Sequence, residues 1–247
     1  MSDEPKNGAG RKGPDVPEPL KRFYTDVSLR EEDDGHALIL LDGRTLRTPA
    51  RAQLKMRTPI ASAMAAEWDA QQTHILPLTM PVTRLVNTAI DGVAAAVASV
   101  QDDLVAIAGN DLIVYRADRP DGLVARQNAA WDPVVRHTEA RFGTTLRLTA
   151  GVMPINQDEG LARAVKASLP DDPLRLAALH QLSTLTGSAL IALAVAAEAL
   201  DLEAAWEAAH VDEDWNIDQW GADAQAAARR NDRKKDADAA AFILREA

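Results

Sequence analysis

The hydrophobic and polar positions of the chain change their period near residue 58, from two residues to between three and four. Before that point, the segments FYTDVSL and AQLKMRT alternate between apolar and polar residues, and the Leu-rich run HALILL precedes Asp42 and Gly43. Such alternation predicts half-buried strands, and Asp-Gly supplies the positive dihedrals of a tight hairpin turn. We therefore predict a small antiparallel unit of three or four strands between residues 23 and 58.

The segment that begins at Pro59 has the period of an amphipathic helix. Proline is favoured in the first turn of a helix, and Ile60, Met64 and Trp68 fall on one side of a helical wheel. Further helices are predicted for the stretch MPVTRLVNTAIDG and for residues 93–108.

A minor strand pair is predicted to bracket a longer helix. Residues 111–117 and 145–155 are short and rich in β-branched or aromatic residues, and GLVARQNAAWDPVVRHTEARFG lies between them. Pro133 inside this helix is expected to kink it or to divide it at Asp132. Beyond residue 158 every segment has a helical pattern, with helices predicted at residues 159–168, 173–199, 202–210 and from 212 to the end.

These patterns predict an α+β protein: a small antiparallel β-rich N-terminal domain followed by a larger all-helical C-terminal domain. The start of the chain, MSDEPKNGAGRKGPDVPEPLKR, is rich in proline, glycine and charge, which is typical of a disordered leader. We place the leader at residues 1–21, the β-rich domain with its short helices at residues 22–95, and the helical domain at residues 96–247.

Composition narrows the function classes. A formal net charge of −10 argues against nucleic acid as a principal ligand, and the basic run RRNDRKK contains an aspartate, as expected for a solvated helix face with acid–base pairs. The longest apolar run, GSALIALAVAAEAL, is too short for a membrane span and contains Glu198. The start lacks an apolar signal region, so it is not a secretory signal, and its acids are unusual in an organelle transit peptide.

Motifs of catalysis and cofactor binding are not found. The chain has no cysteine, its five histidines do not pair at helical spacing, and no glycine-rich phosphate loop or nucleophile elbow occurs. We therefore expect no cofactor, no nucleotide, no metal and no enzyme activity. The many carboxylates leave one alternative open, a hydrolase or lyase that uses acidic residues of the C-terminal helices with or without a divalent metal. An interaction scaffold is a third possibility.

Polar residues form a line inside an otherwise apolar helix. In MPVTRLVNTAIDG, Arg84, Asn87 and Asp91 are separated by three, four and seven positions, which puts them on one side of the predicted helix. Such a line is typical of a charge-paired ridge or an interdomain latch, and a binding site is the alternative.

The segment DEDWNIDQWGAD places two indoles among carboxylates. Asp212 is predicted as the N-cap of a helix in which Trp215 and Trp220 lie on different sides. We expect the Trp215 side to face the core, with Asp218 at its edge, and the Trp220 side, which carries Glu213, to be offered to a partner. Alternatively, Trp220 packs against the β domain and Glu213 pairs with a local arginine.

Seven segments of the chain resemble, in order, a family of assembly chaperones. They are LDGRTLRTPA, EWDAQ, MPVTRLVNTAIDG, NDLIVYRA, RQNAAWDP, LTGSALIALA and DEDWNIDQWG. The family handles the alpha subunit of the catalytic sector of F-type ATP synthase, and the resemblance runs from about residue 21 to residue 242.

The resemblance implies a non-enzymatic holdase that binds the free alpha subunit and prevents its aggregation. Members of the family belong to mitochondria and to bacteria, so a start that does not look like a transit peptide indicates a bacterial, cytoplasmic member. We expect it to be a monomer when free. The chain departs from the family at Ala222 and Gln225, where members often carry acids. The residues expected to bind the partner are Glu213, Asp214, Ile217, Trp220 and Asp223, and those of the possible interdomain or binding line are Arg84, Asn87 and Asp91.

Overall fold

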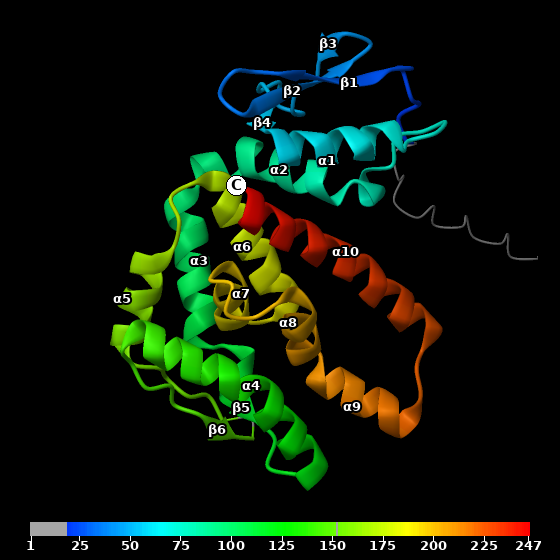
Figure 1. The fold of residues 1–247 in the computed structure, drawn as a ribbon. Helices are drawn as coiled ribbons and strands as arrows, with labels where there is room; N and C mark the ends of the chain where they lie inside the picture. The colour runs from blue at the N-terminus through cyan, green and yellow to red at the C-terminus, as the bar shows by residue number, and fades with distance from the viewer. Residues whose placement is uncertain (1–18, 152) are drawn as a thin grey trace, which may run out of the picture.

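The computed structural model describes residues 19–151 and 153–247, which form a small β sheet above a larger set of helices (Figure 1). The predicted leader, residues 1–21, lies outside these residues except for its last three. In the sheet, the second strand pairs antiparallel with each of the other three, and Asp42 and Gly43 have φ of 48° and 76° in the hairpin turn. The predicted hairpin is thereby confirmed. The strands are β1 (Val27–Glu31), β2 (His36–Leu41), β3 (Arg44–Thr45) and β4 (Lys55–Arg57).

Two helices lie beneath the sheet. Helix α1 (Thr58–Asp69) packs against β1 and β2 and buries Ile60 and Met64 completely, as its apolar period predicts. The short helix η1 (Pro77–Thr79) leads into α2 (Pro81–Asp91). The carboxylate of Glu67, in the last turn of α1, accepts hydrogen bonds of 2.7 and 2.8 Å from the first backbone amides of α2, which have no partner inside the helix.

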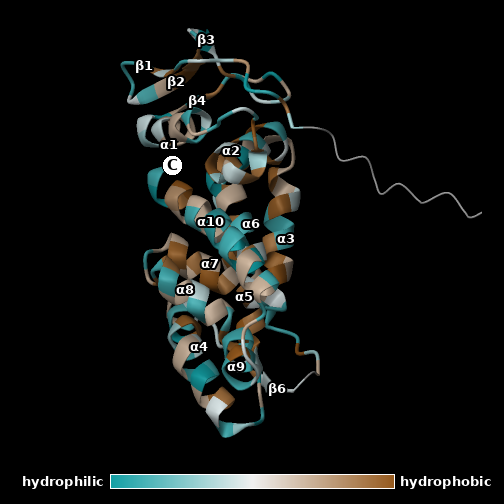
Figure 2. Cartoon of the chain, turned by 90° about the vertical axis from the view of Figure 1, so that its right-hand side faces the viewer, coloured by the Kyte–Doolittle hydropathy of each residue, from teal (hydrophilic) through white to brown (hydrophobic). Residues whose placement is uncertain are grey.

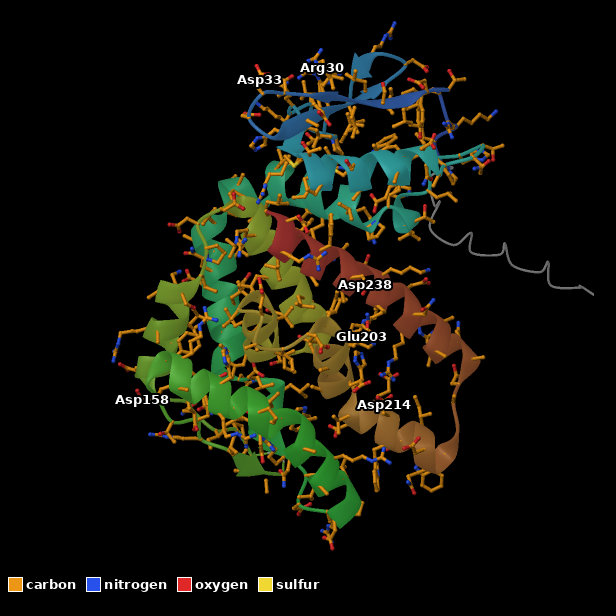
Figure 3. The ribbon with its side chains drawn as sticks, in the orientation of Figure 1. Arg30, Asp33, Asp158, Glu203, Asp214 and Asp238 are labelled. Atoms are coloured by element: carbon orange, nitrogen blue, oxygen red, sulfur yellow. The ribbon has the colours of Figure 1, made fainter. Side chains whose placement is uncertain are left out.

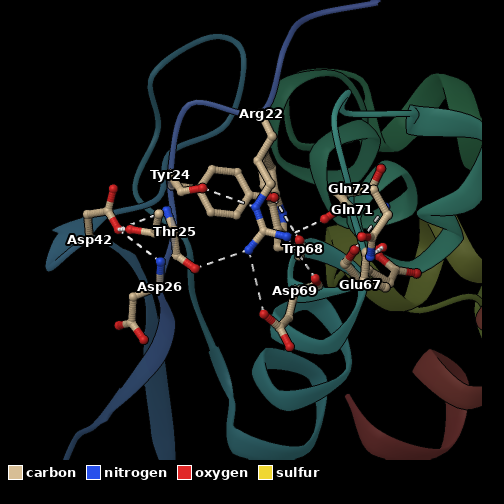
Figure 4. A network of polar contacts seen from close by, with 11 residues as sticks. Arg22, Tyr24, Thr25, Asp26, Asp42, Glu67, Trp68, Asp69, Gln71 and Gln72 are labelled. Atoms are coloured by element: carbon tan, nitrogen blue, oxygen red, sulfur yellow. Dashed lines mark hydrogen bonds and ion pairs between the residues drawn. The ribbon is translucent and has the colours of Figure 1, made fainter.

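Arg22, near the start of the described residues, forms a hydrogen bond and an ion pair with Asp69 at the end of α1 (Figure 4). Its guanidinium donates to the carbonyl oxygens of Tyr24 and Asp69 at 3.1 and 3.0 Å and to that of Gln71. The hydroxyl of Tyr24 in turn donates to the carbonyl of Trp68 at 2.6 Å. These contacts close one end of the β-rich part over α1.

Helix α6 runs through the middle of the helical part and packs against α2, α3, α7 and α10. Helix α7 beside it, coloured as hydrophobic in Figure 2, is apolar at every position, and its first six residues are buried. The remaining elements, in chain order, are η2 (Val93–Ala95), α3 (Val97–Gly109), η3 (Leu112–Val114), β5 (Tyr115–Arg116), α4 (Asp121–Phe142), β6 (Thr149–Ala150), α5 (Glu159–Ser168), α6 (Pro173–Thr186), α7 (Ala189–Ala196), α8 (Leu202–Ala209), α9 (Val211–Trp220) and α10 (Ala224–Glu246).

Three helix predictions need correction. The segment predicted as helical from residue 212 to the end is divided into α9 and α10, because Gly221 has a φ of 89° and ends the first helix. The single helix predicted for residues 173–199 is divided into α6 and α7, because Gly187 adopts a left-handed conformation, φ 68°, and Ser188 caps the next helix by accepting from the amide of Ile191 at 2.9 Å. Residues 93–108 are likewise split, into η2 and α3. Helix α4 runs through Pro133 without the division at Asp132 given as one alternative.

The predicted strand pair, β5 with β6, does bracket α4, and it is parallel. The α+β architecture is confirmed. The division at residue 95 stays a prediction: α2, which precedes it, packs against α1 of the β-rich part and also against α10 of the helical part. Among the described residues no single helix is long and apolar enough to cross a membrane. One pair of neighbouring segments reaches that length together, Pro81–Ala95 with Val97–Val114, and it is bent by 104°.

Candidate partner-binding groove

Helix α9 begins directly after α8, and His210 forms the joint. The prediction that Asp212 is the N-cap is wrong: the helix begins at Val211, and His210 occupies the cap position. The side chain of Asp212 instead accepts a 2.7 Å hydrogen bond from Nε2 of the buried Gln127 in α4. Asp212, Glu213 and Asp214 lie in the first turn, where the positive end of the helix dipole favours acids.

One side of α9 packs against α4. The indole of Trp215 lies so close to Gly122 that a Cβ added there would be 2.7 Å from Trp215 Cη2. Arg126 covers the same indole, with its Cζ 5.0 Å from the ring centroid, and donates to Asp218 at 2.6 Å. Trp215 therefore packs against a neighbouring helix with Asp218 beside it. The predicted core position needs correction, because Trp215 is only half-buried and does not join the hydrophobic core.

The opposite side of α9 faces a groove of about 830 Å³. Helix α9 packs against α4 while α10 packs against α6 and α2, so the two helices diverge from the turn that joins them (Figure 1). Trp220, the last residue of α9 beside the turn that joins it to α10, is 87% exposed, so it does not pack against the β domain. The lining residues are Glu203, Trp206, Glu213, Asn216, Ile217, Trp220, Gly221, Ala222, Asp223, Ala226, Ala227, Arg230, Asn231 and Lys234.

The cations of the groove are already paired with acids. Arg230 of α10 forms two hydrogen bonds with Asp214, and this carboxylate raises the pKa of the guanidinium. Lys234 contacts Glu203 at 2.6 Å and Asp238 at 2.7 Å. Figure 3 labels these three acids, with Glu203 and Asp214 on the α8 and α9 side of the groove.

Two acids of the groove are left without such a partner. Neither Glu213 nor Asp223 forms an ion pair with a lysine or arginine of the described residues. Glu213 lies 3.9 Å from Nε2 of His210, whose pKa burial lowers, so this ring is neutral at pH 7. Asp223 caps α10 by accepting from the amide of Ala226 at 2.6 Å. The groove therefore combines an apolar lining with excess negative charge.

Four of the five predicted partner-binding residues line this groove: Glu213, Ile217, Trp220 and Asp223. The fifth, Asp214, stands beside it and holds Arg230. Sequence reasoning did not include the wall that α8 and α10 provide. A continuous helical wheel puts Ala222 and Ala226 on the Trp215 side, but they line the groove because the helix ends at Trp220. Trp206 and Arg230 carried no signal, because their neighbours are distant in sequence.

The predicted polar line of α2 lies elsewhere. Arg84 forms an ion pair with Asp236 in α10, and the carboxylate of Asp91 accepts from the backbone amide of Ala50 at 3.0 Å. The side-chain oxygen of Asn87 is buried and has no hydrogen-bond partner among the described residues. Two of the three residues thus connect α2 to other parts of the fold.

Acidic and histidine side chains of the described residues do not form a group of three or more that could hold a metal ion. The described residues, 19–151 and 153–247, therefore offer no metal site that would support the alternative of a metal-dependent hydrolase.

Known proteins share this architecture along nearly the whole chain. A family model described as ATP12 chaperone protein matches residues 21–139. The Atu1473 protein of Agrobacterium tumefaciens is 44% identical, with a TM-score of 0.86 over 92% of this chain and 85% of that one. Atp12 of Paracoccus denitrificans is 36% identical, with a TM-score of 0.82 over 92% of this chain and 97% of that one.

Fold and similarity together define a chaperone of ATP synthase assembly. The chain belongs to the ATP12 chaperone family. Both solved relatives are bacterial proteins, in agreement with the bacterial origin expected from the sequence.

Proposed function

We propose that this protein binds the unassembled alpha subunit of F-type ATP synthase in the groove between α9 and α10 and keeps it from aggregating until assembly. The observation that carries the proposal is Trp220, a large aromatic side chain that is 87% exposed beside the groove. Tryptophan is enriched among residues that dominate protein interfaces, and exposed apolar patches commonly mark such interfaces.

Binding of this kind acts by mass action and consumes no nucleotide. A chaperone that occupies the client's apolar surface lowers the concentration of free, aggregation-prone client. Release then requires a partner with greater affinity for the same surface. A monomeric free state and a cytoplasmic location are part of the proposal.

The test is the aggregation of an alpha subunit diluted from denaturant, followed by light scattering with and without this protein. We expect suppression at stoichiometric excess. Unchanged aggregation would overturn the proposed function.

The groove is tested by Glu213→Lys, which reverses the charge of one unpaired acid. We expect affinity for the alpha subunit, measured by titration calorimetry, to fall at least about tenfold, the equivalent of about 1.4 kcal/mol. Asp103→Lys is the matched control, because Asp103 is exposed on α3 and does not line the groove. The melting temperature and far-ultraviolet circular dichroism should stay unchanged in both variants. A marked loss of stability in Glu213→Lys alone would assign Glu213 a structural role instead.

A further inference from the structure

We infer that the element held in the groove is an amphipathic α-helix with basic residues at both ends of its apolar face. This inference rests on the proposed function, since it describes the form of the client at the same site. Four observations carry it: the backbone around the groove, the spacing of side chains along α9, the small residues of α10, and the position of the unpaired acids.

The backbone around the groove cannot extend a β sheet. Every lining residue lies in α8, α9 or α10, or in the turn of residues 221–223. Helical amides and carbonyls are already bonded to each other, so the groove offers no strand edge to an extended peptide. A partner must therefore be held by its side chains.

The face that α9 presents has the spacing of a helix-binding surface. Glu213, Ile217 and Trp220 are separated by four and three residues, and they follow one another over about 10 Å of the helix axis. A docked helix has side chains at the same spacing of three and four residues, so the ridges of one helix can fit into the grooves of the other.

The wall opposite α9 allows close approach. Helix α10 contributes Ala226 and Ala227, whose side chains are too small to keep another helix away, and the groove holds about 830 Å³. Packed helices lie 8 to 10 Å apart, and small residues permit the lower value. Side chains of a third helix can thus fill the space in which α9 and α10 diverge.

Charge fixes what the docked helix carries at its ends. The unpaired Glu213 lies in the first turn of α9, and the unpaired Asp223 lies beyond the other end of α9, in the turn that leads into α10. Ile217 and Trp220 come between them along the chain. Lysines or arginines on one side of the client helix, flanking its apolar anchors, complement this pattern.

The experiment uses the full chain labelled with 5-fluorotryptophan, whose five indoles give five fluorine resonances. The Trp220 resonance is assigned with Trp220→Phe. The probes are the intact alpha subunit and overlapping peptides of about 20 residues that cover it, long enough for roughly five helical turns. We expect the intact subunit and a small number of peptides to shift the resonances of Trp220 and Trp206, which line the groove, and to leave that of the buried Trp131 in place.

Each binding peptide is then compared with two proline variants. Proline in the middle breaks a helix, whereas proline at the first position is tolerated. We expect the central proline to weaken binding at least tenfold and the first-position proline less than twofold. Replacing a terminal lysine or arginine of the peptide by glutamine should weaken binding to the unaltered protein and have little effect on Glu213→Gln.

The outcomes separate the two proposals. Equal affinity of both proline variants shows an extended client and overturns the helix inference while the groove stands. A Trp220 shift with the intact subunit but with no peptide shows that the groove holds a folded surface, and it overturns the helix inference as well. If the intact subunit leaves the Trp220 resonance unchanged, the groove is not its binding site and the proposed function at this site fails.

Discussion

Asp111 is fully buried and accepts hydrogen bonds from two helices, η3 and α7, neither of which the sequence pattern predicts as a separate element. One carboxylate oxygen accepts from the amide of Ile113 at 3.3 Å, and the other accepts from the amide of Leu190, at the start of α7, at 3.0 Å. Burial raises the pKa of this carboxyl to about 6, and the hydrogen bonds from the Ser188 hydroxyl and from backbone amides oppose the shift. Free aspartate titrates near 3.9.

The raised pKa predicts how stability depends on pH. The folded state holds the Asp111 proton more tightly than the unfolded state, so the contribution of this group is fully present below about pH 3.9 and is lost as pH rises through about 6. Asp111→Asn removes this titration. We expect the stability of the protein relative to the variant to fall by about 2 to 3 kcal/mol between pH 4 and pH 7. Urea denaturation at both pH values measures it, and an equal difference at the two values would contradict the prediction.

At the scale of single residues, the sequence predicts which side chains share a face of a helix. It does not predict contacts between residues that are far apart in the sequence. The wheel of residues 212–223 placed Trp215 and Trp220 on different sides because helical spacing is local. It assigned Asp212 to a cap, whereas its partner Gln127 lies 85 residues away. That Trp220 binds the client stays a prediction.

At the scale of elements, one of the contacts that hold α9 against α4 leaves no room for a methyl group. Gly122 of α4 lies under the Trp215 indole, and the side chain of any other residue would push the two helices apart. The groove keeps its shape only while α9 is held in this position.

Gly122→Ala should therefore destabilise the α4–α9 contact by about 1 to 3 kcal/mol, although alanine has the higher helix propensity. Gly109→Ala is the matched control, because a Cβ at Gly109, also in a helix, meets nothing within 4 Å. We expect the control to be neutral or slightly stabilising. Thermal unfolding of both variants measures the difference, and equal melting temperatures would show that the indole can move aside without cost.

The elements that the sequence predicts correctly are those with a long, uniform period. Helix α1 and the hairpin at Asp42 and Gly43 follow from local pattern and turn chemistry. The break at Gly187 was missed because the segment that follows, residues 189–196, is apolar at every position, so it has no periodicity from which a separate helix could be recognised.

At the scale of the whole molecule, α2 connects the β-rich part to the helices. Arg84 pairs with Asp236, 152 residues further along, and Gln181 of α6 donates to the carbonyl of the same aspartate at 2.9 Å. These contacts bring α2 and α6 to one residue of α10, Asp236, at its carboxylate and at its backbone carbonyl. Sequence analysis could name Arg84 as a possible latch, but it had no means of identifying Asp236 among many acids.

A double-mutant cycle of Arg84→Met and Asp236→Asn measures this latch. The two side chains are 37% and 26% exposed, so solvent weakens the pair, and we expect a coupling energy of about 0.5 to 1.5 kcal/mol. The exposed pair Lys235–Asp232 within α10 is the control, with an expected coupling below about 0.5 kcal/mol. A latch coupling no larger than that of the control would show that α2 is held by apolar packing alone.

The acids beside Trp220 have a consequence for encounters between identical copies of the chaperone. An exposed indole favours association, because a second copy of the protein can bury it. Two copies that met in this way would bring Glu213 and Asp223 of one against the same residues of the other, and each copy carries a net charge of −10. Repulsion between the carboxylates disfavours self-association, whereas a basic client is attracted to them. The same carboxylates therefore favour binding of the client over binding of a second chaperone.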